Sequence, residues 1–367
     1  MRRIILITTA IAMLTACGSN ELKIVVGTYT DAGSYGIYSL SFDTRTGEAA
    51  LLDSCRTVNP SYLTMSRNGK YIYAVSELGS SNAAVYALRF DKRSGAFTPI
   101  NTTLAGGTDP CYISTNGKVV ATADYGGTLS IYPIASDGGL KPVKSVFNGS
   151  TGGPDTLRQS TPHIHCAEFS RDGKRLFVSD FSADRILCFD VTRGGRRIRP
   201  ALAEDGQQLV VNVAPDYGPR HLVFDRKGNH AYLIGELSGA VTLFDAEDNM
   251  LTIRQVIDAD PYDGRGSGDI HISPDGRYLY VSNRLKGDGI AIFSIDPGSG
   301  ELTEAGYQLT GIHPRHFNIT PDGRYLLCAC RDDNTIEIYS RDKKSGLLTP
   351  TGKNIALSKP VCVQFVE

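Results

Sequence analysis

The sequence predicts an all-β fold, a seven-bladed β-propeller with four antiparallel strands in each blade. A phrase with a glycine turn between alternating apolar residues recurs roughly every 50 residues, a period typical of propellers and solenoids. A third and a fourth run, separated by a second turn, follow most copies and complete a four-stranded unit. No stretch shows the helical period of helical repeat arrays. The turn glycines are Gly69, Gly117, Gly173, Gly228, Gly276 and Gly323.

The two ends of the chain are predicted to build the seventh blade together. The C-terminal run 360–366 reads as a first strand without a following turn, and the run 23–29 reads as a second strand without a first. Residues 36–52 then supply the third and fourth strands. Pairing of the two ends closes the ring and covers two sheet edges that would otherwise favour association. We therefore expect a single propeller domain over residues 23–367, and a monomer.

The N-terminus indicates export. Residues 1–16 begin with MRR, continue as an apolar run and end in LTA before Cys17, a pattern that resembles a bacterial lipobox. We expect a signal peptide over 1–16, lipid attachment at Cys17 and a tether over 17–22. The protein would then be a cell-envelope lipoprotein on the periplasmic or surface side, held to the membrane only by its lipid. An ordinary signal peptide, or a chance apolar start to a cytoplasmic protein, is the alternative.

Composition excludes several other classes. Lys and Arg number 38 against 39 Asp and Glu, so no basic field for nucleic acid is expected. The cysteines after Cys17 are odd in number and lie in apolar runs, which predicts buried free thiols. Nucleotide-binding glycine loops and the HExxH zinc motif are absent from the sequence. The pair His163 and His165 is a weak metal signal, so we expect neither a metal nor a cofactor.

Aligning the repeats on the turn glycine predicts where a site would lie. Positions eight before and eight after this glycine fall at the same end of each hairpin, at one mouth of the central channel. Arg and His gather there, and Arg binds carboxylate or phosphate while His is a usable base near neutral pH. We expect a site for a small anionic ligand; the alternative is a polar ring that joins the blades by ion pairs. The candidates are His165, Arg220, His221, Glu236, Arg284, Arg315 and His316.

The longest break in the repeat leads to the same mouth. Residues 148–165 are rich in Gly, Ser, Thr and Pro and end in the strand that carries His163 and His165. Long loops in compact domains are often functional. We expect this loop to cover the mouth and to add Arg158 and Gln159 to the site, unless it is a passive surface loop.

Four segments of the sequence resemble a known family. RQSTPHIH (158–165), GPRHLVFDRKGNHAYLIGEL (218–237), GDIHISPDGRYLYVSNR (268–284) and HPRHFNITPDGRYLLCACRDDN (313–334) are similar to the seven-bladed lactonase family. That family includes the bacterial propeller-type 6-phosphogluconolactonase and the fungal carboxy-muconate lactonizing enzyme. The resemblance implies a site formed by His165, Arg220 and Glu236, with Arg284 and Arg315 as further members. Gly235 stands where the family usually has Asn.

The resemblance implies a carboxylic ester hydrolase that opens a sugar lactone without a cofactor. In this scheme His165 is the base, Glu236 orients the base or the water, and Arg220 stabilises the oxyanion. Sequence does not choose between His163 and His165 as the base. Substrate contacts are expected from Arg158, Gln159, His163, His221, Arg284, Arg315 and His316. The alternative is a non-catalytic propeller that binds a sugar acid or a partner protein at the cell envelope.

Overall fold

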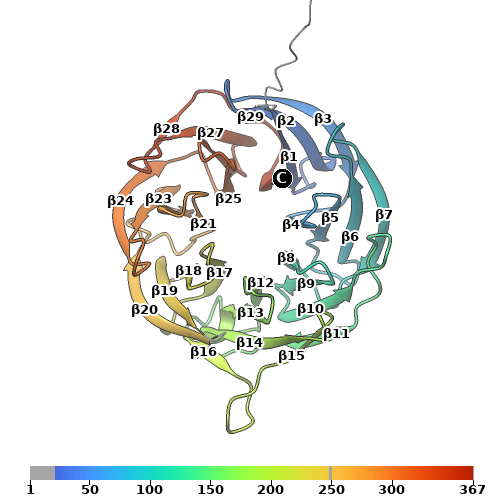
Figure 1. Ribbon diagram of the computed structural model, residues 1–367, viewed down its shortest axis with the longest axis vertical. Coiled ribbons are helices and arrows are strands. Elements are labelled where there is room, and N and C mark those ends of the chain that lie inside the picture. Colours follow the sequence, from blue (N-terminus) through green and yellow to red (C-terminus); the bar gives the residue numbers. More distant parts are fainter. Residues whose placement is uncertain (1–20, 248–249, 367) are drawn as a thin grey trace, which may run out of the picture.

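Seven four-stranded antiparallel blades surround a central axis in the computed structural model, which describes residues 21–247 and 250–366 (Figure 1). In each blade the first strand lies innermost and the fourth lies at the rim. The blades that carry the turn-glycine repeat confirm the predicted hairpins, because all six turn glycines have φ between 65° and 79°. No helix in the described part of the chain has the length and apolarity to cross a bilayer.

The first three blades follow the order of the sequence. Blade 1 consists of β4 (Leu63–Met65), β5 (Tyr71–Ser76), β6 (Ala84–Phe90) and β7 (Phe97–Leu104). Blade 2 consists of β8 (Pro110–Thr115), β9 (Val119–Asp124), β10 (Thr128–Pro133) and β11 (Ser145–Asn148). Blade 3 consists of β12 (Ile164–Phe169), β13 (Arg175–Asp180), β14 (Arg185–Thr192), β15 (Arg197–Pro200) and the extra strand β16 (Val210–Asn212), with the 3₁₀ turn η1 (Phe181–Ala183) after β13.

The next three blades repeat the pattern. Blade 4 consists of β17 (Pro219–Phe224), β18 (His230–Gly235), β19 (Ala240–Glu247) and β20 (Met250–Asp258). Blade 5 consists of β21 (Ile270–Ile272), β22 (Tyr278–Asn283), β23 (Gly289–Ile295) and β24 (Leu302–Leu309). Blade 6 consists of β25 (Pro314–Ile319), β26 (Tyr325–Cys330), β27 (Thr335–Arg341), β28 (Leu348–Pro350) and the short β29 (Ile355–Ala356).

Blade 7 confirms the predicted closure of the ring by the two ends of the chain. It has the strand order β3 (Glu48–Arg56), β2 (Gly36–Asp43), β1 (Glu21–Thr28), β30 (Pro360–Val366). The ladder between β1 and β30 pairs Lys23 with Val366 and Gly27 with Cys362. The predicted signal peptide and Cys17 lie outside the described residues.

The predicted tether, residues 17–22, overlaps the first strand of the propeller by two residues. Its last residues, Glu21 and Leu22, already belong to β1, where they pair with Asp43 and Phe42. Leu22 also packs against an apolar cluster of blades 6 and 7. The backbone ladder and this apolar contact therefore draw both residues into the propeller.

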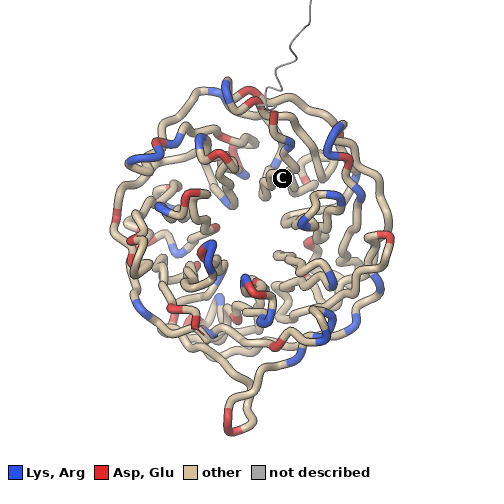
Figure 2. Tube along the Cα trace, viewed as in Figure 1, with Lys and Arg blue, Asp and Glu red and all other residues tan. Residues whose placement is uncertain are grey.

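Apolar faces of neighbouring blades pack on one another and form the core. Between blades 4 and 5, for example, Tyr232 and Val241 pack with Leu279 and Phe293. The seven cysteines after residue 20 are free thiols, and all but Cys55 are fully buried, as predicted. Figure 2 shows Lys and Arg interspersed with Asp and Glu around the ring, in keeping with the balanced composition.

Aromatic side chains from four blades contact one another near the axis of the ring. Tyr62, just before β4, lies with its ring centroid 4.4 Å from that of Tyr112, 5.6 Å from His221 and 5.5 Å from His316. These four rings come from blades 1, 2, 4 and 6, and we call them the plug. The plug lies next to the mouth predicted from the repeat, since His221 follows Arg220 directly.

Candidate functional site

A repeated β-bulge aims side chains into the predicted mouth. At the mouth end of the innermost strands the ladder register shifts between Ile164 and Cys166 in β12, between Pro219 and Leu222 in β17, and between Pro314 and His316 in β25. A residue at such a bulge has no ladder partner, and bulges next to active sites re-aim side chains. The residues at the shifts are His165, Arg220, His221 and Arg315.

The second strands supply the opposite part of the wall. The first residue after β5, β18 and β22 is Glu77, Glu236 and Arg284 respectively, as the repeat frame predicted. The first residue after β1 is Tyr29, which the frame missed because blade 7 has no turn glycine. We use the name cup for a group of eight residues at this mouth: Tyr29, Glu77, Arg158, His165, Arg220, Glu236, Arg284 and Arg315.

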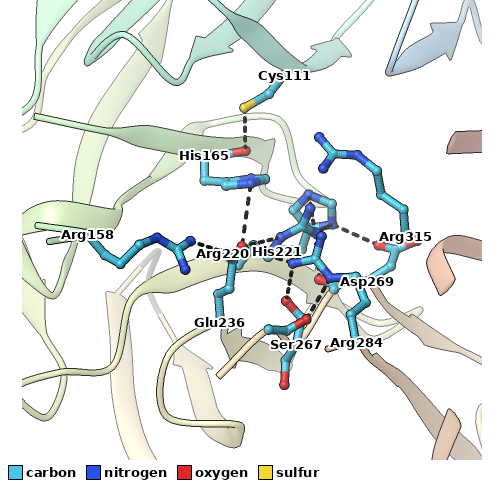
Figure 3. A network of polar contacts seen from close by, with 12 residues as sticks. Cys111, Arg158, His165, Arg220, His221, Glu236, Ser267, Asp269, Arg284 and Arg315 are labelled. Atoms are coloured by element: carbon cyan, nitrogen blue, oxygen red, sulfur yellow. Dashed lines mark hydrogen bonds and ion pairs between the residues drawn. The ribbon is translucent and has the colours of Figure 1, made fainter. Parts of the chain in front are cut away.

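Glu236 is the centre of the cup (Figure 3). Its carboxylate accepts a hydrogen bond from Arg220 Nε at 2.8 Å and one from Arg158 Nη2 at 2.6 Å, and lies 3.3 Å from Arg284 Nη2. Burial raises the pKa of this carboxyl, but the three guanidinium groups outweigh burial and lower it to about 2. Glu236 is therefore ionised throughout the neutral range, and three cations share one anion.

Arg220 is held rigidly on three sides and is only 2 % exposed. Besides Glu236, its Nη1 donates to the backbone oxygen of Gly268 at 2.6 Å and lies 3.2 Å from His221 Nε2. A guanidinium fixed in this way is a preorganised donor, because its orientation costs no reorganisation when a ligand's charge develops.

Arg284 is fixed by backbone oxygens rather than by its ion pair alone. Its Nε donates to Gly266 at 2.6 Å and its Nη2 donates to Ser267 at 3.1 Å. Burial lowers the pKa of Arg284 to about 9, although Glu236 opposes the shift. The group stays charged near neutral pH, so the cup retains its excess of positive charge.

His165 faces this charge as a neutral imidazole. Its Nε2 lies 3.9 Å from Glu236 Oε2, and its Nδ1 is buried without a hydrogen-bond partner among the described residues. Burial, and after it the charge of Arg220, hold the pKa of His165 well below the usual range. A buried polar atom without a partner is costly, so Nδ1 is an atom for a ligand or water to satisfy.

The two histidines that sequence could not tell apart lie in different surroundings. The His163 ring stacks on Tyr125 with centroids 4.0 Å apart, and its Nδ1 lies 2.5 Å from the Tyr125 backbone oxygen. Its Nε2 lies 3.2 Å from the Thr161 hydroxyl. His163 is thus engaged outside the cup, and His165 is the histidine beside Arg220 and Glu236.

His221 and His316 turn to the floor of the cup, where they meet Asp269. His221 Nδ1 lies 2.8 Å from Asp269 Oδ1, and His271 Nε2 and His316 Nε2 lie 2.8 Å and 3.4 Å from Oδ2. Burial raises the pKa of this carboxyl, but its histidine partners bring it well below the usual range. Asp269 fixes His221 so that its Nε2 faces Arg220, which makes Asp269 a positioning residue.

The Asp269 group has the composition of a metal site, but one hydrogen bond argues against metal ligation. Ligand atoms of Asp269, His271 and His316 lie within 4.8 Å of one another. However, His316 Nδ1 accepts the backbone N–H of Val363 at 3.3 Å. A neutral imidazole that accepts at Nδ1 carries its proton on Nε2, whereas a ligating Nε2 needs a free lone pair. The hydrogen bonds therefore indicate that Asp269 is a carboxylate that accepts from N–H donors, not a metal ligand.

The long loop before β12 supplies one of its two predicted residues. Arg158 reaches Glu236, as described above. Gln159 does not face the cup: its amide nitrogen donates to Phe181 O at 3.0 Å and to Asp184 at 2.8 Å, and its oxygen accepts the Asp155 N–H at 3.1 Å. The nitrogen and the oxygen of the Gln159 amide both anchor the loop. This corrects the predicted role of Gln159 in binding substrate.

A second contact that holds this loop, an ion-pair bridge, could not be predicted from the sequence repeat. Arg265, in the segment before β21, bridges Asp155 of the loop and Asp216 of the segment before β17, with contacts of 2.8 Å to each. The bridge joins three mouth segments of blades 3 to 5. It therefore holds the backbone from which Arg158 extends.

Gly235 is explained by close packing. A Cβ atom at this position would lie 2.7 Å from ring atoms of Tyr217 and 2.3 Å from the Ser238 hydroxyl. The Tyr217 hydroxyl donates to backbone oxygens of β18 and β19. The ring thus occupies the space that a side chain before Glu236 would need.

A hollow of about 950 Å³ lies on the other face of the ring, away from the cup. It is lined by turns that follow β17, β21 and β23, and His271 is at its edge. Its charged groups belong to solvent-facing turns, whereas the cup has buried and convergent groups. We place the candidate site in the cup for this reason.

Sequence comparison agrees with the fold. The family model described as "Lactonase, 7-bladed beta-propeller" matches residues 23–365. The chain is 36 % identical to a 6-phosphogluconolactonase of Formosa agariphila and 33 % identical to one of Bacillus subtilis. Both matches cover 93 % of this chain, and they cover 98 % and 97 % of the respective relatives.

Two solved structures extend the comparison. A candidate 6-phosphogluconolactonase of Bacteroides uniformis is 51 % identical, with a TM-score of 0.92 over 95 % of this chain and 100 % of the other. The periplasmic gluconolactonase of Pseudomonas aeruginosa is 31 % identical, with a TM-score of 0.87 over 95 % of this chain and 99 % of the other. Fold and comparisons define a propeller enzyme of the lactone-opening class. The chain belongs to the seven-bladed β-propeller lactonase family.

We expect Glu236→Gln to lower the melting temperature by roughly 5 °C at neutral pH, since it leaves the buried Arg220 and Arg284 and the partly exposed Arg158 without their anion. The pKa of this carboxyl is about 2 when folded, below its value in an unfolded chain. Its stabilisation is thus fully present above about pH 5 and is lost as the pH falls through about 2. Calorimetry from pH 7 downwards should show the two melting temperatures converging.

The matched control for this measurement is Glu304→Gln, at an exposed position on the outer strand β24. Its melting temperature should follow that of the unmodified protein at every pH. A deficit of Glu236→Gln that stays constant down to pH 2 would contradict the ionised state assigned to Glu236.

Proposed function

We propose that this chain hydrolyses a sugar lactone in the cup, with chemistry like that of a 6-phosphogluconolactonase. The observation that carries the proposal is the sharing of Glu236 by three arginines beside a neutral His165. Such a site has an excess of fixed positive charge for an oxyanion and an imidazole for a proton. The names of the curated relatives and the family support the same reaction class.

In the proposed reaction a water oxygen attacks the lactone carbonyl while His165 removes a proton from that water. The carbonyl oxygen becomes an oxyanion against Arg220. The bond between the carbonyl carbon and the ring oxygen then breaks, and the departing alkoxide takes the proton from His165. The products are a carboxylate with a free hydroxyl and, after ionisation, one released proton.

The low pKa of His165 fits this sequence of events. Much of the shift comes from burial and the positive charge of Arg220. An oxyanion that forms against Arg220 offsets that charge, so the imidazole becomes more basic as the intermediate forms. Proton uptake and oxyanion formation are coupled through the same guanidinium.

Sequence suggested that Glu236 orients the base or the water, and its contacts favour a further positioning role. A carboxyl with a pKa near 2 and contacts to three guanidinium groups is a poor proton acceptor at neutral pH. We propose that Glu236 positions Arg158, Arg220 and Arg284 rather than activating water. The names of the curated relatives favour an enzyme over a propeller that only binds a sugar acid or a partner protein.

His165→Ala should lower kcat by roughly 10²–10⁴, because it removes the proposed base. Arg220→Ala should lower kcat by a factor of roughly 10²–10³ through loss of the oxyanion donor. Turnover of glucono-δ-lactone, followed by acid release after subtraction of the spontaneous rate, measures both effects. Melting temperatures establish that each variant is folded.

His163→Ala is the matched control, because His163 stacks on Tyr125 outside the cup. It should keep kcat within about threefold of the unmodified protein. Full activity in folded His165→Ala would reject His165 as the base. Ligand binding without turnover of any lactone by the unmodified protein would favour the non-catalytic alternative.

We propose that the protein acts outside the cytoplasm as a lipoprotein anchored at Cys17. The described chain starts at Glu21, at the end of β1 that lies opposite Tyr29 and the cup. An anchor four residues earlier would therefore attach on the face of the hairpin turns. The mouth would then open away from the membrane, toward soluble substrate. The periplasmic gluconolactonase among the similar structures supports such a location.

Cys17→Ala should abolish incorporation of labelled palmitate in the native host and move the protein from the membrane to the soluble fraction. The matched control is Cys55→Ala, which changes a cysteine within the propeller and leaves the leader intact. Incorporation that does not depend on Cys17, or none at all, would reject the anchor.

A further inference from the structure

The two halves of the cup carry different charge. On blades 3 to 5 three guanidinium groups share Glu236, as described above, so positive charge exceeds negative charge. The other half, on blades 6, 7 and 1, is formed by Arg315, Tyr29 and Glu77. Here one guanidinium faces one carboxylate, and the formal charge is balanced.

Arg315 contacts both other members of the balanced half. Its Nη2 lies 3.4 Å from Glu77 Oε2, and its guanidinium lies over the Tyr29 ring, 5.3 Å from the centroid. The Tyr29 hydroxyl donates to Glu77 Oε1 at 2.8 Å. The side chains of Arg315 and Glu77 are 15 % and 18 % exposed, so both are accessible from the cup.

A second carboxylate lies near Glu77. Asp109 directly precedes β8, as His163 directly precedes β12. Its backbone N–H donates to the Leu78 backbone oxygen at 2.8 Å, so it lies next to the segment that carries Glu77. Burial, and after it the charge of Glu77, raise the pKa of Asp109.

Two further cations near this half, one after β26 and one before β30, are also engaged. Arg331 makes two hydrogen bonds to Asp332, at 2.9 Å and 2.8 Å, and Lys359 contacts the same carboxylate at 2.9 Å. The half of the cup across from Glu236 thus offers a phosphate group one arginine with the carboxylate of Glu77 beside it, and Asp109 lies on the neighbouring blade.

We propose that the substrate is an unphosphorylated sugar lactone, whose hydroxyl-bearing tail lies against Glu77 and Tyr29, and that Glu77 selects against the phosphorylated form. This inference rests on the proposed function, which places the lactone carbonyl at Arg220 and therefore sends the tail to the other half. Carboxylate and phenol oxygens accept hydrogen bonds from sugar hydroxyls. A phosphate dianion there would meet like charge, and repulsive elements of this kind create specificity.

The test compares kcat/KM for glucono-δ-lactone and for its 6-phosphate on the same preparations. The unmodified mature protein should favour the unphosphorylated lactone by about tenfold or more. Glu77→Gln keeps the shape and removes the charge, and it should shift the ratio toward the phosphorylated lactone by about tenfold. Asp109→Asn should shift the ratio in the same direction. This variant replaces Glu77→Gln in the test if Glu77→Gln does not fold. Glu304→Gln, on the outer strand β24, should leave the ratio unchanged.

The outcomes separate this inference from the proposed function. If the unmodified protein prefers the phosphorylated lactone, or if folded Glu77→Gln and Asp109→Asn leave the ratio unchanged, the substrate assignment is overturned and the lactonase proposal stands. If the unmodified protein opens neither lactone, the proposed function fails and the substrate assignment fails with it.

Discussion

The sharing of Glu236 by Arg158, Arg220 and Arg284 is the interaction on which the rest of the site depends. Arg220, Arg284 and Glu236 are buried, where unpaired cations would be costly, and Arg158 reaches them from the loop before β12. One carboxylate reduces that cost but leaves an excess of positive charge. Burial, and after it the charge of Arg220, keep His165 neutral. Hydrogen bonds to Glu236 and to the Gly268 backbone oxygen make Arg220 a fixed donor, so structural and chemical roles arise from the same contacts.

The fold provides this arrangement by two repeated features. The bulge at the mouth end of the innermost strands turns His165, Arg220 and Arg315 toward the axis. A plug of aromatic rings around Tyr62 packs against His221, next to the cup. Closure by β30 matters for the site as well, since β30 gives His316 the Val363 N–H that fixes its tautomer. Remote strands therefore set the positions of groups near the cup.

Sequence periodicity predicted the propeller, its closure and the meeting of the three catalytic candidates, because hairpin positions repeat from blade to blade. It could not show that His221 turns to Asp269, since a bulge breaks the two-residue alternation of a strand and depends on ladder register. Tyr29 was missed because its blade lacks the turn glycine that defined the frame. The anchoring role of Gln159 depends on a loop conformation with no repeat to reveal it.

A crystal structure of the protein with an aldonate product bound would test the central claim most directly. The account predicts the carboxylate within hydrogen-bond distance of Arg220 and beside His165, with the polyol tail reaching Glu77 and Tyr29. Glu236 should keep its contacts to the arginines. A product bound in the hollow on the opposite face, or a carboxylate held by Arg315 with the tail at Arg220, would contradict it.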